Sequence, residues 1–113
     1  MNLPQPLPDP LIELIARRFR VIGEPMRIKL LAALREREAS VSELREATGA
    51  SQQNVSKHLG VLLEANIVGR RKDGNQVFYS ILDESVFRLC EEVCGGLQRQ
   101  VGELNAIVGG VGR

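Results

Sequence analysis

The central stretch of the chain, residues 40–66, most constrains what it can fold into. Ser40 and Glu43 have the spacing of a capping box, in which a serine and a later glutamate satisfy the free N–H groups at a helix start. Gly49 can end that helix in the left-handed conformation, and Ser51 can cap another helix directly afterwards. Two short helices joined so closely predict a helix-turn-helix unit.

The second of these helices has an unusually polar beginning, although its inner face is apolar. The residues that recur at helical spacing and predict a buried face are Val55, Leu59, Leu62 and Leu63. A helix N-terminus offers free N–H groups, and an amide side chain can donate to and accept from one adenine edge in the major groove. The residues predicted to contact DNA from this helix are Ser51, Gln52, Gln53, Asn54, Ser56, Lys57 and His58. The alternative is a solvated helix start in which Ser51 only caps.

A basic hairpin is expected directly after this helix. Two β-prone runs, residues 68–72 and 76–82, flank an Asp-Gly-Asn tripeptide that is typical of tight turns. The first run carries Arg70, Arg71 and Lys72, and residues 51–82 as a whole are basic whereas the rest of the chain is slightly acidic. Phosphate contacts position a protein on DNA, and base contacts give specificity. We therefore predict that these three cations contact DNA beside the polar helix start.

Helices are also expected on both sides of this central region. A proline at every second position from 4 to 10 predicts an extended arm at residues 1–8, with Asp9 capping a helix that ends at Gly23. Pro25 begins a further helix, and Asp83 can cap a last helix that reaches at least Leu104. Residues 109–113 are expected to fray.

The last helix carries an apolar stripe that recurs every three or four residues. Its members are Val86, Cys90, Val93, Leu97, Val101, Leu104 and Val108. A stripe of this length exceeds what one small core can cover, so it favours a helical homodimer interface.

These elements predict a mainly α fold with a small β-hairpin, in the order α-α-α-α-β-β-α: a winged helix-turn-helix in one domain, residues 1–113. No stretch reaches the roughly 20 apolar residues of a membrane span, and the N-terminus has no secretory pattern. A cytoplasmic protein without a membrane partner is therefore expected. The carboxylates and cysteines are not accompanied by a second histidine, a phosphate-binding loop or a nucleophile elbow, so no catalytic site and no enzyme activity are expected.

Three stretches, GEPMRIKLLAAL, SVSELREATGASQQNVSKHLGVLLEANIV and RRKDGNQVFYSI, resemble the ArsR/SmtB family of winged-helix transcriptional regulators. The resemblance covers residues 15–90. It implies a homodimer through the first and last helices, whose two recognition helices and two wings contact a pseudo-palindromic operator. It also implies a repressor that leaves DNA when an inducer, often a metal ion, binds. His58 matches a histidine often found at this place, and we favour a hydrogen-bonding or phosphate role for it over a metal ligand.

The chain departs from the two main metal-site patterns of that family. Residues 40–42, Ser-Val-Ser, stand where one pattern has Cys-x-Cys, and His58 is the sole histidine where the other needs several on the last helix. The remaining candidates for sensing an inducer are Cys90 and Cys94, which share one face of the last helix. They could bind a thiophilic metal or metalloid ion, or react with an oxidant or a reactive sulfur species. Alternatively, Cys90 is a small buried hydrophobe of the stripe.

Two other functions remain open at this point. One is a DNA-binding repressor with no ligand of its own, and the other is a winged helix used only for protein–protein contact. The amides of the polar helix start and the basic run of the hairpin argue against the second.

Overall fold

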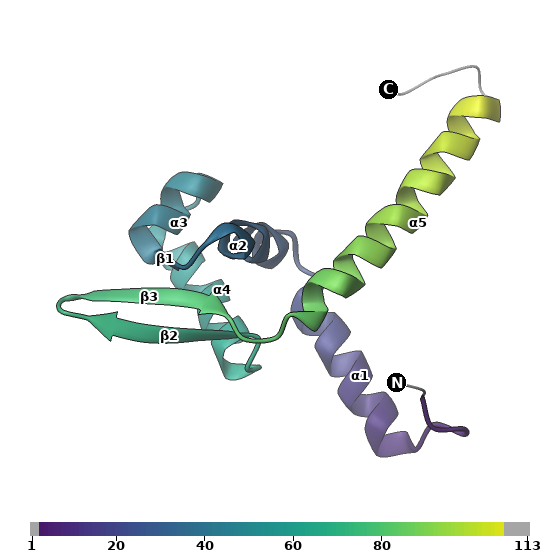
Figure 1. Ribbon diagram of the computed structural model, residues 1–113, viewed down its shortest axis with the longest axis horizontal. Helices are drawn as coiled ribbons and strands as arrows, with labels where there is room; N and C mark the ends of the chain where they lie inside the picture. Colours follow the sequence, from purple (N-terminus) through teal and green to yellow (C-terminus); the bar gives the residue numbers. More distant parts are fainter. Residues whose placement is uncertain (1–2, 108–113) are drawn as a thin grey trace. The chain divides into compact units, whose positions relative to one another are not determined.

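The helix-turn-helix unit forms where its capping residues predict it (Figure 1). In the computed structural model, which describes residues 3–107 and the side chains of residues 3–103, α3 (Val41–Thr48) begins at a complete capping box. The N–H of Glu43 donates to Ser40 Oγ at 3.2 Å, and the N–H of Ser40 donates to Glu43 Oε1 at 2.9 Å. Gly49 ends α3 with a φ of 75°. α4 (Gln52–Glu64) begins at Ser51, whose Oγ accepts from the N–H of Asn54 at 3.1 Å.

Two helices precede this unit, α1 (Asp9–Ile22) and α2 (Pro25–Glu36). α1 begins one residue earlier than predicted, because Pro8 is its N-cap and makes no side-chain capping bond, while Asp9 is already helical. Pro10 is tolerated there because first-turn N–H groups have no intrahelical acceptor. α2 is capped by Glu24, whose carboxylate accepts from the N–H groups of Met26 and Arg27.

The hairpin pairs with a third, very short strand. β2 (Val68–Asp73) and β3 (Gln76–Ile81) are antiparallel, and β1 (Ala39–Ser40) pairs with the other edge of β3, giving the order β1-β3-β2. Gly74 is the first of the two turn residues and has a φ of 63°, which favours glycine. Ser40 is at once the last residue of β1, opposite Phe78, and the N-cap of α3.

The core of residues 3–83 is formed by one face of each of α2, α3 and α4 together with the start of β2. Its most deeply buried members are Leu30, Leu31, Leu34, Leu44, Val55, Leu59, Leu62, Ile67 and Val68. Three of the four residues predicted to face inward from α4 are fully buried, and Leu63 is half-buried. This apolar face fixes which side of α4 remains exposed.

α5 (Ser85–Ile107) belongs to a second unit that begins after Asp83 and is described by itself. Three members of its apolar stripe, Val93, Leu97 and Val101, are exposed, and Cys90 is half-buried. The side chain of Leu104, the residue Val108 and the tail at 109–113 lie outside the described residues. Within residues 3–107, no helix combines the length and the apolar character that crossing a bilayer requires.

Candidate nucleic-acid interface

The polar residues at the start of α4 form one exposed surface. Its members are Ser51, Gln52, Gln53, Asn54, Ser56 and Lys57, and we call them the α4 polar face. Val55 and Leu59 are fully buried from the same helix, and Ser56 and Lys57 between them face solvent. The Ser51 cap leaves other first-turn N–H groups available to an anion. This surface therefore combines free N–H groups, amides, hydroxyls and one cation.

His58 does not belong to the α4 polar face, which corrects its predicted contact with DNA. The residue is only 6% exposed, because position 58 lies three residues after Val55 and one before Leu59, on the inward side of α4. Its Nδ1 lies 3.1 Å from Nη1 of Arg27, and its Nε2 lies 3.9 Å from Oε1 of Glu24. The imidazole therefore faces α2 rather than an external phosphate.

The three cations of the hairpin are divided between its two sides. Side chains alternate along a strand, so Arg70 and Lys72 point one way and Arg71 the other. Arg70 and Lys72 are exposed, and neither side chain makes a hydrogen bond or ion pair within the part of the chain that the structure describes. Arg70 and Lys72 are therefore better candidates for phosphate contacts than Arg71, which is paired within the protein.

Arg71 is engaged by its own protein. Its Nε lies 3.2 and 3.1 Å from the two carboxylate oxygens of Glu38, and its Nη2 bonds the same carboxylate. Its guanidinium also lies over the ring of Phe78, 5.0 Å from the centroid, and 3.7 Å from Asp73. The hydrogen bonds from Arg71 lower the pKa of Glu38, although partial desolvation opposes them. A phosphate would therefore compete with Glu38 for the Arg71 guanidinium.

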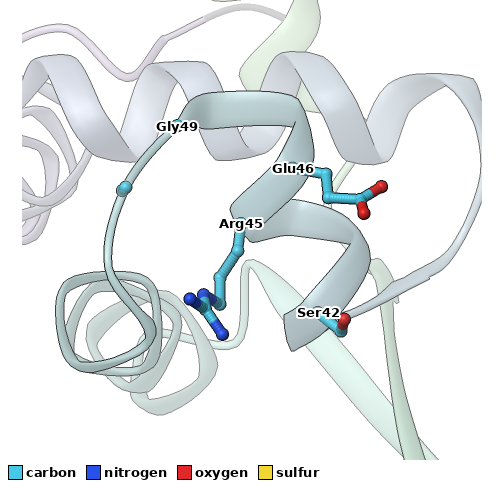
Figure 2. Close-up of a pocket in the computed structure, with 5 residues that line it drawn as sticks. Ser42, Arg45, Glu46 and Gly49 are labelled. Atoms are coloured by element: carbon cyan, nitrogen blue, oxygen red, sulfur yellow. The ribbon is translucent and has the colours of Figure 1, made fainter.

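One exposed basic residue of the helix-turn-helix, Arg45, was not among the residues predicted to contact DNA. Arg45 is exposed on α3 and lines a shallow pocket together with Ser42, Glu46, Gly49 and Ala50 (Figure 2). Figure 2 shows its guanidinium and the Glu46 carboxylate leaving α3 in different directions, and Arg45 has no side-chain partner among residues 3–103. The first helix of a helix-turn-helix crosses the DNA backbone, so a cation one turn before Gly49 was the available signal.

The two cysteines lie on adjacent turns of α5. Both are free thiols, with Cys90 half-buried and Cys94 exposed. Two sulfur atoms are fewer donors than the four of a structural zinc site. Across the described residues, no three His, Cys, Asp or Glu side chains come together as a metal site. The pair therefore offers two sulfur donors within one chain.

Known proteins with the same arrangement identify the family. Residues 22–71 match a family model described as a helix-turn-helix domain. The chain is 40% identical over 86 residues to the HTH-type transcriptional regulator KmtR of Mycobacterium tuberculosis, covering 76% of this chain and 66% of that protein. The crystal structure of M. tuberculosis Rv0081 superposes with a TM-score of 0.74 at 36% identity, covering 85% of this chain and 97% of that one.

A solution structure of Mb0332 from Mycobacterium bovis has the same winged helix-turn-helix architecture. It is a homodimeric winged helix-turn-helix DNA-binding domain, described as a possible ArsR-family regulator, with 26% identity, a TM-score of 0.72 and coverage of 82% of this chain and 86% of that one. The chain belongs to the ArsR/SmtB family. This ArsR/SmtB-family protein is a winged helix-turn-helix transcriptional regulator, and the members of its family are DNA-binding transcription factors.

Proposed function

We propose that this regulator represses transcription in the cytoplasm by binding a pseudo-palindromic operator as a homodimer. The observation that carries the proposal is the α4 polar face, which is exposed over its whole length while Val55 and Leu59 anchor the helix. A recognition helix of this kind enters the major groove with its N-terminal residues against the base edges.

The contacts divide by chemistry. Gln52, Gln53 and Asn54 carry the amides that suit adenine edges, and each good pair contributes about 1–3 kcal/mol of discrimination. Ser51, Ser56 and Lys57 offer hydroxyls and a cation to phosphates or bases beside them. Arg70 and Lys72 supply the phosphate contacts of the wing, which is the β2–β3 hairpin (residues 68–81). Arg71 contacts phosphate as well only where the phosphate displaces Glu38.

Exposed apolar residues on the terminal helices support the homodimer. α1 exposes Leu14 and Phe19, and α5 exposes Val93, Leu97 and Val101. Large apolar side chains grouped on a helix face mark an interaction surface. Pairing these helices with a second copy would cover them and present two α4 helices to two operator half-sites.

Selection of bound duplexes from a random DNA pool, followed by binding measurements, tests this function. We expect a two-fold symmetric site, a steep dependence on salt, and a Gln53→Ala variant that loses preference at particular bases. A Gln98→Ala variant on α5 is the matched control and should bind as the parent does. Retention of all duplexes with equal affinity would contradict base reading, and no retention at all would favour a winged helix for protein contact.

The cysteines are the proposed sensor of an inducer. Cys94 is exposed and Cys90 half-buried one turn away, so a thiophilic metal or metalloid ion, an oxidant or a reactive sulfur species can reach the pair. We expect arsenite, cadmium, persulfide or peroxide to release the operator from the parent protein and not from a Cys90→Ser, Cys94→Ser double variant. Release from both proteins would exclude these thiols, and release from neither would indicate a repressor with no ligand of this class.

A further inference from the structure

The side chain of Arg27, on α2, joins the end of α1 to α4. Its Nε donates to the carbonyl of Val21 at 2.5 Å, and its Nη2 donates to the carbonyl of Arg20 at 3.4 Å. Its Nη1 lies 3.1 Å from Nδ1 of His58. One guanidinium thus bonds the last turn of α1 and the recognition helix at the same time.

The chemistry of the two side chains fixes the direction of this bond. Arginine is always protonated and only donates, so Nδ1 of His58 accepts and the ring carries its proton on Nε2. The carbonyls of Arg20 and Val21 lie in the last turn of α1, where no following turn supplies N–H groups. The planar fork of a guanidinium can serve acceptors in several directions, which the single ammonium of a lysine cannot reproduce.

Glu24 holds the base of Arg27 in place. Its Oε1 accepts from the N–H groups of Met26 at 2.7 Å and Arg27 at 3.2 Å, and it lies 3.9 Å from Nε2 of His58. Desolvation raises the pKa of Glu24, but the backbone hydrogen bonds from Arg27 and Met26, together with the positive charge of Arg27, lower it by more. The carboxylate is therefore ionised at neutral pH and caps α2 beside the imidazole.

Burial makes this contact unusual within the protein. Across the described residues, His58 is the sole buried polar or charged side chain, at 6% exposure. A leucine could fill the same space without needing a partner, whereas a buried polar ring requires one. Burial of Val55, Leu59 and Leu62 selects the side of α4 that faces the core, and this driving force is non-directional. A hydrogen bond is directional and can adjust the rotation of the helix further.

We propose that Arg27 and His58 are positioning residues for DNA reading: their bond sets the rotation of α4 relative to the end of α1, and so aligns Gln53 and Asn54 with base edges. The inference rests on the proposed function of α4 as the base-reading helix. Base contacts demand close geometry, whereas phosphate contacts made by flexible cations tolerate small shifts. Loss of the bond therefore lowers affinity for the operator more than affinity for other DNA.

Two substitutions at position 58 separate positioning from packing. His58→Leu keeps apolar bulk and removes the acceptor, whereas His58→Asn keeps an oxygen acceptor close to the position of Nδ1. We expect the ratio of operator affinity to scrambled-duplex affinity to fall about tenfold in His58→Leu. It should stay within about threefold of the parent in His58→Asn. Arg27→Lys should reproduce the Leu result, and the His58→Leu, Arg27→Lys double variant should lose little more than either single one.

The measurement uses the full chain, the operator obtained by selection, a scrambled duplex of equal length, and thermal unfolding of each variant. If both affinities fall together in proportion to the folded fraction, the role is structural and the inference is overturned. Equal losses for Leu and Asn, or additive losses in the double variant, would also overturn it. Amide hydrogen exchange gives a readout without DNA: exchange in α4 should quicken in His58→Leu and recover in His58→Asn.

Gln53→Ala in the same assay distinguishes this inference from the function on which it rests. If Gln53→Ala leaves the affinity ratio unchanged, the base-reading role of α4 fails. If Gln53→Ala lowers the ratio and His58→Leu does not, α4 reads bases without the help of Arg27 and His58.

Discussion

Asn66 connects α4 to β2 in a backbone conformation that few residue types adopt. Its φ of 61° places it in the left-handed region, where its N–H bonds the carbonyl of Leu63 at 3.0 Å and the next N–H, of Ile67, bonds the carbonyl of Leu62 at 3.0 Å. Asparagine and glycine accept this region at lower cost than other residues. The residue thus follows the C-cap of α4 and directs the chain into β2.

Substitution of Asn66 tests that reading. Asn66→Ala should lower the free energy of unfolding by about 1 kcal/mol, because alanine pays the steric cost of a positive φ. Asn66→Gly should leave it unchanged or raise it slightly. Urea unfolding of the three proteins measures the differences, and equal stability of the Ala and Gly variants would argue against strain at this position.

The bond between Glu38 and Arg71 makes part of the stability depend on pH. Arg71 lowers the pKa of Glu38 in the folded protein, so this contribution is complete above the unfolded value of 4.5 and is lost as the pH falls through the folded pKa. The stability difference between the parent and Glu38→Gln should therefore be largest at neutral pH and shrink below pH 4.5. Unfolding measured across this range checks the sign, and a difference independent of pH would contradict it.

At the scale of elements, the wing should act through one of its two sides. Arg70→Ala should weaken binding to every DNA sequence and reduce the salt slope by about one, because Arg70 is exposed without an internal partner among the described residues. Arg71→Ala should reduce the slope less, because Glu38 already neutralises its guanidinium. Titrations at several salt concentrations compare the two variants, and equal slopes would show that DNA displaces Glu38.

Local signals predicted the elements well. Ser40 with Glu43, and Ser51 before the amides, placed α3 and α4 through bonds that span only three residues. β1 was not predicted, because a strand of two residues shows no alternation of apolar and polar side chains. Its pairing with β3 also joins segments that are far apart in sequence. The partners of Arg71 and His58 were not predicted either, because these contacts also join distant parts of the sequence: Glu38 and Arg27 lie 33 and 31 residues away. The burial of His58 itself could have been predicted from the sequence, because it lies three residues after Val55 and so on the same face of the helix.

At the scale of the whole molecule, the exposed apolar side chains of α5 predict the oligomeric state. Leu97→Glu would place a charge in the proposed interface, where burying an unpaired carboxylate is costly. We expect this variant to sediment as a monomer at concentrations where the parent is a dimer, and to bind the operator at least tenfold more weakly. Gln98→Glu, one position along the same helix, should remain a dimer, and a dimeric Leu97→Glu variant would exclude this face.

The double role of Ser40 has a consequence for engineering. Because one residue closes the wing's sheet against Phe78 and starts α3, the wing and the helix-turn-helix are not interchangeable modules. An insertion between β1 and α3 would either shift the register of β1 against β3 or remove the Ser40 cap from α3. A chimaera that borrows the β2–β3 hairpin of a relative must therefore carry residues 38–43 along with it.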